Sequence, residues 1–227
     1  MANVVSVNIS ERKGEQKHPV PEIQLKFRHG IVGDAHAGDW HRQISLLAEE
    51  SVDTMRASCP IPLDPGVFAE NINTEGIDLK HLPVGTHLRI GETEVEVTQI
   101  GKECHSDCAI RQQTGDCIMP REGVFARVVK GGTIHTGDEM KLLPTPADLP
   151  LRAAVITLSD RSAAGQRPDE SGPAIAKRLL DAGYEVVEQI LLPDERALLE
   201  KNLIRLADQR QLDLVLTTGG TGFAPRD

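Results

Sequence analysis

The sequence predicts a multidomain chain in which a mostly β barrel precedes a partial α/β domain with three layers and a parallel sheet. Residues 144–150 contain three prolines in seven positions, which is typical of a semi-rigid linker. Before this segment, short apolar runs alternate with turn residues, and after it strand and helix patterns alternate. We therefore expect a β domain over residues 1–143, a linker over 144–150 and an α/β domain over 151–227.

The first domain is expected to be built mainly from antiparallel strands. Gly91-Glu92 is suited to a hairpin turn, and residues 49–57 have the one clearly helical pattern. Many short strands joined by turns favour a barrel. The expected strands cover residues 4–9, 23–27, 44–47, 87–90, 94–100, 124–129 and 139–143.

The second domain follows the order strand, helix, strand, helix, strand. Strands are expected over residues 153–158, 185–192 and 212–216. A helix over 173–182 is expected to end at Gly183, and leucines at helical spacing between positions 198 and 206 predict a second helix. Such alternation predicts parallel strands joined by right-handed crossovers.

Composition excludes several classes of function. The net charge of −9 disfavours a general nucleic-acid or anionic-membrane surface, and 3% aromatic residues disfavour a stacking platform for single strands. No apolar run approaches the roughly 20 residues of a membrane helix, and the N-terminus lacks a signal pattern. Four cysteines without other signs of secretion favour reduced thiols, so we expect a cytoplasmic protein.

Three polar segments follow the three strands expected in the second domain. The first contains Ser159 and Asp160, the second contains Asp194, and the third contains a glycine-threonine loop and Asp227. Parallel strands bring their carboxyl ends to one edge, where open α/β sheets bind ligands. The loop residues are Gly219, Gly220, Thr221 and Gly222.

Convergence of these segments predicts a site for a phosphate or pterin, with Asp194 and Asp227 placed to hold a divalent cation. Two simpler interpretations stay open for the separate parts. Asp194, which follows Pro193, has the position of a cap for the next helix. The glycine-threonine loop, taken alone, has the composition of an ordinary turn.

The same segments resemble a known family. Thr-Leu-Ser-Asp-Arg at 157–161, Asp-Glu-Ser-Gly-Pro at 169–173, Pro-Asp-Glu at 193–195 and the terminal Thr-Thr-Gly-Gly-Thr-Gly-Phe-Ala-Pro-Arg-Asp resemble the molybdopterin-binding Mog/MoaB family. Members adenylylate molybdopterin with ATP and Mg²⁺. The resemblance implies that Asp194 and Asp227 are catalytic aspartates, and that Ser159, Asp160 and the loop from Gly219 to Gly222 bind the pterin.

The family domain continues for about as many residues again. From residues 1–227 alone we expect weak binding of molybdopterin and no adenylylation, because Asp227 is the last residue and nothing after it holds its carboxylate in place. The complete family domain implies trimers, whereas a homo-oligomer of this chain stays open.

The first domain has a resemblance of its own. Its motifs are Gly-Ile-Val-Gly-Asp-Ala-His-Ala-Gly at 30–38, Arg-Gln-Ile-Ser-Leu-Leu at 42–47, Phe-Ala-Glu-Asn-Ile-Asn-Thr at 68–74, Leu-Pro-Val-Gly at 82–85 and the segment 131–138. In this order they resemble a MOSC domain, the carboxy-terminal module of molybdenum cofactor sulfurases. The resemblance implies a β-barrel that handles molybdenum cofactor and carries a reactive cysteine.

Cys104 stands where the family places its cysteine. Lys102 and His105 flank it and favour the thiolate that sulfur transfer or molybdenum ligation requires. We expect Cys104 to be the most reactive of the four thiols. Cys108 and Cys117 either join it in a zinc or iron–sulfur site, whose spacing would match no common signature, or are small buried hydrophobes. Cys59 is expected to be inert.

Basic residues of the first domain are further candidates. His36 is either a cofactor contact or a structural histidine oriented by Asp34. Arg42 belongs to a basic cluster that either binds a cofactor phosphate or is a solvated surface. Arg127, in an apolar strand, is expected to pair with a carboxylate or face a pocket. The cluster comprises Lys26, Arg28, His29, His41 and Arg42.

Together the two resemblances predict a protein of molybdenum cofactor biosynthesis or handling that binds molybdopterin or the finished cofactor. Whether it catalyses a reaction stays open, and the alternative is a non-catalytic carrier or storage module. Because the sequence contains no cysteine desulfurase region, any sulfur has to come from a partner. A sulfur donor or a molybdoenzyme is therefore the expected protein partner.

Overall fold

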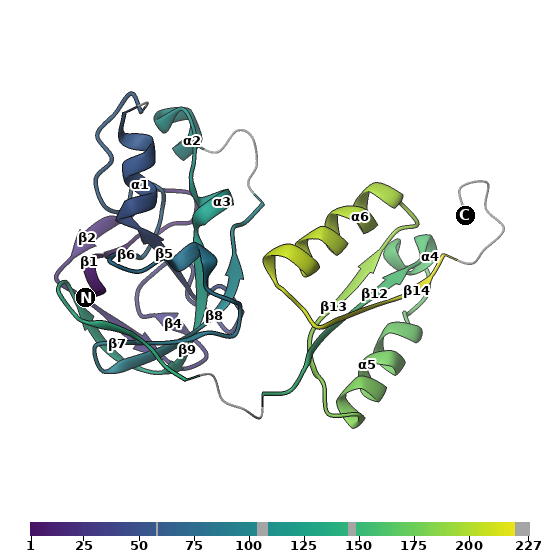
Figure 1. Cartoon of the computed structure of the whole chain (residues 1–227). Coiled ribbons are helices and arrows are strands. Elements are labelled where there is room, and N and C mark those ends of the chain that lie inside the picture. Colours follow the sequence, from purple (N-terminus) through teal and green to yellow (C-terminus); the bar gives the residue numbers. More distant parts are fainter. Residues whose placement is uncertain (58, 104–108, 145–148, 221–227) are drawn as a thin grey trace. The chain divides into compact units, whose positions relative to one another are not determined.

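The structure is a computed structural model that describes residues 1–57, 59–103, 109–144 and 149–220. Its contacts divide the chain into two units, Met1–Thr145 and Pro146–Asp227. The first unit is rich in strands, and the second places helices around a parallel sheet (Figure 1). Among the described residues, no helix is long and apolar enough to cross a membrane.

The first unit contains an eight-stranded sheet in the order β11-β7-β8-β9-β5-β6-β1-β2. Its pairs are antiparallel except for β5 with β6, which run parallel. The strands of this sheet are β1 (Asn3–Ile9), β2 (His18–Val20), β5 (Ile44–Ala48), β6 (Ile72–Glu75), β7 (His87–Ile90), β8 (Thr93–Ile100), β9 (Val124–Lys130) and β11 (Met140–Leu142). A second sheet has the order β10 (Gly132–His135), β3 (Glu22–Lys26) and β4 (Gly30–Ile31).

The closed barrel that the strand pattern predicted is not found among the described strands. The first part of β1 meets the segment before β11 at one isolated bridge, Asn3 with Glu139, and Met140 N donates to Ala2 O at 2.9 Å. The last part of β1 instead pairs with β2. Because residues 7–9 of β1 already pair with β2, only the first residues of β1 are left to meet the segment before β11, and no continuous ladder forms there.

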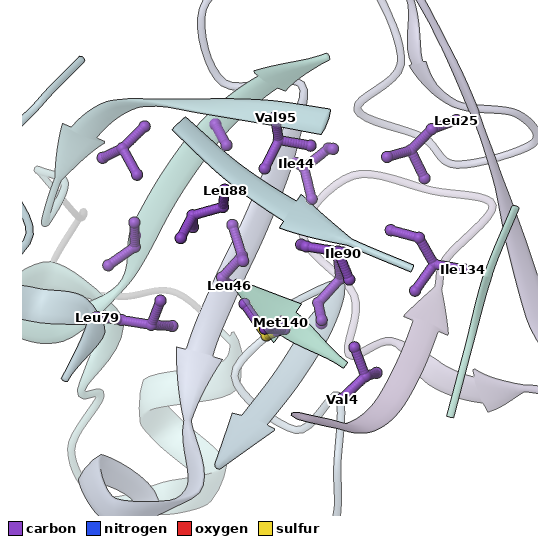
Figure 2. Packing of buried hydrophobic residues seen from close by; sticks show 14 of the residues in the cluster. Val4, Leu25, Ile44, Leu46, Leu79, Leu88, Ile90, Val95, Ile134 and Met140 are labelled. Carbon is purple, nitrogen blue, oxygen red and sulfur yellow. The ribbon is translucent and has the colours of Figure 1, made fainter. Parts of the chain in front are cut away.

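The interior of the first unit follows the period-two pattern of its strands. Val95 and Val97 of β8 and Val124, Ala126 and Val128 of β9 are buried in one cluster, as alternation on a pleated strand requires. Figure 2 shows side chains from several strands, among them those of Leu46, Leu88, Ile90 and Met140, gathered in this core.

Helices and turns complete the first unit. The predicted helix is present as α1 (Glu49–Arg56), and Gly91 occupies the predicted turn with a φ of +55°. A second apolar cluster around Phe68 contains residues of α1 and α3 (Met119–Glu122). The remaining helices are α2 (Ala109–Thr114) and the 3₁₀ turn Leu79–His81. The short strands β2, β4, β6 and β10 have no strand counterpart in the sequence-based expectation.

The second unit has a parallel sheet in the order β13-β12-β14. Its elements are β12 (Arg152–Leu158), α4 (Asp160–Ala163), α5 (Ser171–Asp181), β13 (Glu185–Leu192), α6 (Arg196–Ile204), the π-helical turn Arg205–Gln209 and β14 (Leu214–Gly219). Along β12 the odd-numbered positions 153 and 155 pack with α5, whereas positions 154 and 156 pack with Leu206 on the other face. The unit therefore has helices on both faces of its sheet (Figure 1).

Candidate functional site

The strands of the second unit end in register at one edge of the sheet. Leu158 at the end of β12 is opposite Leu192 of β13 and Gly219 of β14. Ser159, Asp160, Asp194 and Gly220 follow directly after these positions. Parallel pairing thus brings the three predicted segments together, as far as the described residues extend.

Asp160 and Asp194 form a reciprocal pair across the ends of β12 and β13. The Asp160 backbone N–H donates to Asp194 Oδ2 at 3.2 Å, and the Asp194 N–H donates to Asp160 Oδ1 at 3.1 Å. The following helix α6 begins at Arg196, and its N-cap residue, Glu195, makes no side-chain capping bond. Asp194 therefore uses its carboxylate to join two strand ends and not to cap α6.

The other carboxylate oxygen of Asp194, Oδ1, has a different environment. Asp194 Oδ1 is buried and has no hydrogen-bond partner within the described part of the chain. The glycine loop lies close to it, because a Cβ added at Gly220 would be 3.8 Å from this oxygen. A buried acceptor without a donor is costly unless a ligand satisfies it.

Glycine is required where β14 ends. Gly219 has a φ of +90°, and an added Cβ would lie 2.0 Å from the carbonyl oxygen of Leu158. Gly220 follows with a φ of +65°. A side chain at position 219 would force β14 away from β12, so the loop composition has a backbone reason.

Ser159 caps the short helix α4. Its Oγ accepts from the Ser162 N–H at 3.3 Å, which leaves the hydroxyl proton for donation. Beside this turn, a surface hollow contains Arg161 as its one cationic side chain among the described residues. The hollow is lined by Asp160, Arg161, Ala163, Ala164, Gln166 and Pro193.

The Asp-Glu-Ser-Gly-Pro motif begins α5. Asp169 Oδ1 accepts from the backbone N–H groups of Ser171 and Gly172, both at 3.1 Å. Burial raises the pKa of Asp169, but hydrogen bonds from Gly172, Thr157 and Ser171 outweigh it, so the pKa lies below its ordinary value. A Cβ at Gly172 would lie 2.6 Å from Thr157 Oγ1, so this part of the motif fixes the helix against β12.

Several predicted site residues lie outside the described residues. They are Cys104, His105, Cys108, Thr221, Gly222 and Asp227. Within the described residues, no group of three or more His, Cys, Asp or Glu side chains is arranged to hold a metal ion.

The first unit contains a buried polar group that we call the Asp34 cluster: Ser10, Lys17, Asp34, His36 and Asn71. Lys17 Nζ forms an ion pair with Asp34 Oδ2, and both side chains are only 1% exposed. Asp34 Oδ2 also accepts from Asn71 Nδ2 at 3.1 Å and from Ser10 N at 3.2 Å. Asp34 Oδ1 accepts from His36 N at 2.9 Å. Asp34 thus orients the loop of His36, as the structural alternative for that histidine expects.

Electrostatics in the Asp34 cluster follow from burial and pairing. Burial acts to raise the pKa of Asp34, but its contacts with His36, whose backbone N–H donates to Oδ1, and with Lys17, together with the Lys17 charge, hold the pKa well below its usual range. Burial lowers the pKa of Lys17, its bond to Asp34 opposes that shift, and the charge of Lys102 adds to it. Lys102 is therefore within electrostatic range of the cluster.

Arg42 lies between two aromatic rings beside this cluster. Its guanidinium carbon is 4.9 Å from the centroid of the Trp40 ring and 5.6 Å from that of Phe125. Trp40 Nε1 donates to His36 O at 2.9 Å, which connects the stack to the Asp34 cluster. Stacking holds a guanidinium in a fixed orientation, as anion recognition requires.

The other basic residues divide between surface and sheet. Arg28 pairs with the exposed Asp39 at 2.5 Å, which supports the solvated-surface interpretation for that part of the basic cluster. Arg127 Nη2 pairs with Glu96 Oε2 at 2.9 Å, which confirms the carboxylate partner expected for this strand arginine.

The two described cysteines are in or beside the Phe68 cluster. Cys117 is buried in it, as the packing alternative expects. Cys59 is half-buried against it, and its Sγ is 3.4 Å from Thr114 O.

The sequence-based reasoning missed Lys17 and the contact of Asn71 with Asp34. Asn71 lies in a motif that the sequence had singled out, so its polarity in an apolar strand pattern was an available signal. Lys17 lies in a polar stretch, Glu11 to His18, and nothing local distinguishes it from its exposed neighbours.

Two family models match separate parts of the chain. Residues 33–141 match the family model of the MOSC domain, and residues 154–227 match that of the probable molybdopterin binding domain. The chain is 42% identical over 80 residues to the molybdopterin adenylyltransferase of Escherichia coli (strain K12), covering 34% of this chain and 40% of that protein.

Two further similarities are informative. The molybdopterin adenylyltransferase of Helicobacter pylori (strain J99) is 44% identical over 84 residues, covering 34% of this chain and 45% of that protein. The chain thus spans less than half the length of these curated relatives. The crystal structure of the YUAD protein from Bacillus subtilis aligns with 62% of this chain and 94% of its own, with a TM-score of 0.50 and 17% identity, which shows a shared fold.

Proposed function

We propose that this chain, which combines a MOSC domain with a molybdopterin-binding domain of the MoaB/Mog type, acts in molybdenum cofactor biosynthesis by binding molybdopterin at the strand ends of its second unit. The observation that carries the proposal is Oδ1 of Asp194, which is buried without a hydrogen-bond partner in the described ranges and lies next to the loop that begins at Gly219 and Gly220. The adenylyltransferase names of the relatives favour a biosynthetic role over a carrier or storage module.

The donor set at Asp194 fits Mg²⁺. This ion prefers oxygen ligands, keeps several waters and uses one or two carboxylates, so Asp194 Oδ1 would be one ligand and Asp227 is proposed as the other. A bound Mg²⁺ would neutralise charge on phosphate oxygens of a nucleotide such as ATP. The chain's own part is to hold the Asp194 carboxylate through the Asp160 N–H on Oδ2, which leaves Oδ1 for the ion.

The remaining residues are proposed as contacts of the pterin and its phosphate. Gly219 and Gly220 have positive φ values and no side chain. A ligand can therefore approach their backbone closely. Ser159 keeps a hydroxyl proton to donate, and Thr221 and Gly222 are proposed to extend the loop. Asp160 contributes by positioning Asp194.

Binding of molybdopterin to the full chain, measured by fluorescence quenching or calorimetry with and without Mg²⁺, tests the proposal. We expect Asp194→Asn to weaken Mg²⁺-dependent binding about tenfold, which corresponds to about 1.4 kcal/mol. The matched control is Asp181→Asn, because Asp181 pairs with Lys177 on the surface of α5. Equal affinity of wild type and Asp194→Asn would contradict the assignment.

In the MOSC domain, we propose that Cys104, His36 and Arg42 contact the cofactor, with Cys104 supplying sulfur or ligating molybdenum. Support comes from Lys102, whose charge acts on Lys17 in the Asp34 cluster. Lys102 stands two residues before Cys104 in the sequence. Arg42 is connected to the same cluster through Trp40. A sulfur donor or a molybdoenzyme is the proposed protein partner.

Alkylation at neutral pH tests the cysteine assignment. We expect iodoacetamide to label Cys104 before the other three thiols, because neighbouring positive charge favours a thiolate. Peptide mapping after brief labelling gives the order. Cys117 is buried and serves as the internal control, and labelling of Cys59 ahead of Cys104 would contradict the assignment.

A further inference from the structure

The side chain of His36 contacts the buried ion pair of the Asp34 cluster. Its side chain is 30% exposed, whereas those of Lys17 and Asp34 are almost fully enclosed. His36 Nδ1 is 3.5 Å from Lys17 Nζ and 3.4 Å from Asp34 Oδ1. A donor and an acceptor therefore compete for one ring nitrogen, and the outcome decides what the other nitrogen can bind.

Lys17 needs this ring nitrogen as an acceptor. Its ammonium has three N–H donors and no acceptor, and it makes three polar contacts: Asp34 Oδ2, Ser10 Oγ at 3.3 Å and His36 Nδ1. If Nδ1 carried a proton, one N–H of a buried ammonium would have no acceptor. Buried donors in folded proteins are nearly always paired.

Asp34 does not need the ring proton. A carboxylate offers about four lone-pair positions. Asp34 already accepts from Lys17 Nζ, Ser10 N, Asn71 Nδ2 and His36 N. Three of these bonds end on Oδ2 and one ends on Oδ1, so each oxygen has a donor even without the imidazole, although Oδ1 keeps one lone pair. The third N–H of Lys17, by contrast, would have no acceptor if Nδ1 were protonated.

We propose that Lys17 is a positioning residue that fixes neutral His36 as the tautomer protonated on Nε2. His36 then presents an N–H donor to an oxyanion, and not a lone pair to a metal cation. The inference rests on the proposed function, in which His36 contacts the cofactor, and it names the chemistry of that contact. Phosphate and molybdate oxygens share this chemistry.

The tautomer can be measured directly on the full chain. Long-range ¹H–¹⁵N spectra of protein with ¹⁵N-labelled histidine distinguish a protonated ring nitrogen from one with a lone pair, and His36→Asn identifies the His36 signals. We expect a lone pair on Nδ1 and a proton on Nε2, and the reverse pattern would overturn the inference. The measurement needs no cofactor, so failure of molybdopterin binding would reject the proposed function alone.

Variants test the role of Lys17. Lys17→Met removes the donors but keeps the apolar stem, so we expect the ring proton to move to Nδ1, where Asp34 Oδ1 accepts it. Lys13→Met is the matched control, because Lys13 is exposed nearby in the sequence, and it should leave the tautomer unchanged. Retention of the Nε2–H tautomer in folded Lys17→Met would show that Lys17 does not fix it.

Titration with simple ions tests the ligand class and does not depend on any variant. We expect inorganic phosphate, inorganic molybdate or both to shift the Nε2 resonance of His36 in the wild type, whereas Zn²⁺ at the same concentration leaves it in place. The anion with the larger shift identifies the source of the oxyanion. A shift with Zn²⁺ and with neither anion would overturn the inference.

Discussion

Asp34 and Asp194 are both carboxylates held by backbone N–H groups, one in each unit, yet their surroundings differ. Asp34 accepts four hydrogen bonds, and the one from buried Lys17 is also an ion pair. Asp194 accepts one backbone hydrogen bond on Oδ2, while its Oδ1 has no donor among the described residues. The first carboxylate is fully satisfied within the protein, and the second is satisfied on one oxygen only.

This difference separates two uses of the same functional group. A buried carboxylate with a protein donor on each oxygen is closed to a ligand, so Asp34 acts on its neighbours by orienting Lys17 and His36. A carboxylate fixed by one oxygen keeps the other for an external cation or donor. Removal of Asp34 should therefore affect folding most, and removal of Asp194 should affect binding most.

The largest expected effect is that of Asp34→Ala. Removing one member of a buried ion pair leaves the Lys17 ammonium uncompensated, which costs about 3–5 kcal/mol of unfolding free energy. Urea denaturation of the full chain, monitored on the first unit, measures it. Asp39→Ala, which removes only the exposed partner of Arg28, is the control and should leave the midpoint unchanged. Similar losses of unfolding free energy in both variants would contradict the structural role of Asp34.

Gly219→Ala should have the next largest effect and tests the backbone at the Asp194 loop. Gly183→Ala is the matched control, because Gly183 has a φ of +88° with nothing near an added Cβ, whereas at Gly219 the Leu158 oxygen would be 2.0 Å away. A positive φ alone costs about 1–2 kcal/mol. Thermal unfolding should show that loss for Gly183→Ala and a clearly larger one for Gly219→Ala; equal losses would mean that β14 can move freely.

Acid should weaken the first unit through Asp34. Its pKa in the folded protein is below its ordinary value of 3.8, so the folded state binds fewer protons than the unfolded state in this range. The contribution of Asp34 is complete above about pH 5 and is lost as pH falls through the folded pKa. Denaturation at a series of pH values should therefore show that the unfolding free energy falls between about pH 4 and 2, and that this fall is smaller in Asp34→Ala. The same fall in wild type and variant would mean that other carboxyl groups cause the loss of stability in acid.

The smallest effect on stability is expected for Asp194→Asn. The amide oxygen can still accept from the Asp160 N–H, and the change removes a charge from a site where Oδ1 has no donor in the described residues. We expect a change within about 0.5 kcal/mol, measured by denaturation of the second unit. A loss comparable to that of Asp34→Ala would show that Asp194 is mainly structural.

The sequence alone determined where the strand ends of the second unit meet. Alternating strand and helix patterns allow parallel pairing in few ways, and parallel pairing aligns the carboxyl ends. Leu158, Leu192 and Gly219 are in register as that argument requires. The helix over 49–57 and the turn at Gly91 followed from local propensity, which depends on neighbouring residues alone.

Only the tertiary structure decided how the side chains are used. Lys17 meets Asp34 and Asn71 because distant segments are brought together, and no local period encodes that contact. The barrel stayed open because β1 pairs with β2 over residues 7–9 and meets the segment before β11 at one isolated bridge, a pairing that the strand pattern does not specify. Asp194 joins Asp160 and does not cap its own helix. Periodicity reports which residues are buried, whereas hydrogen-bond partners depend on register and loop path, which pattern does not specify.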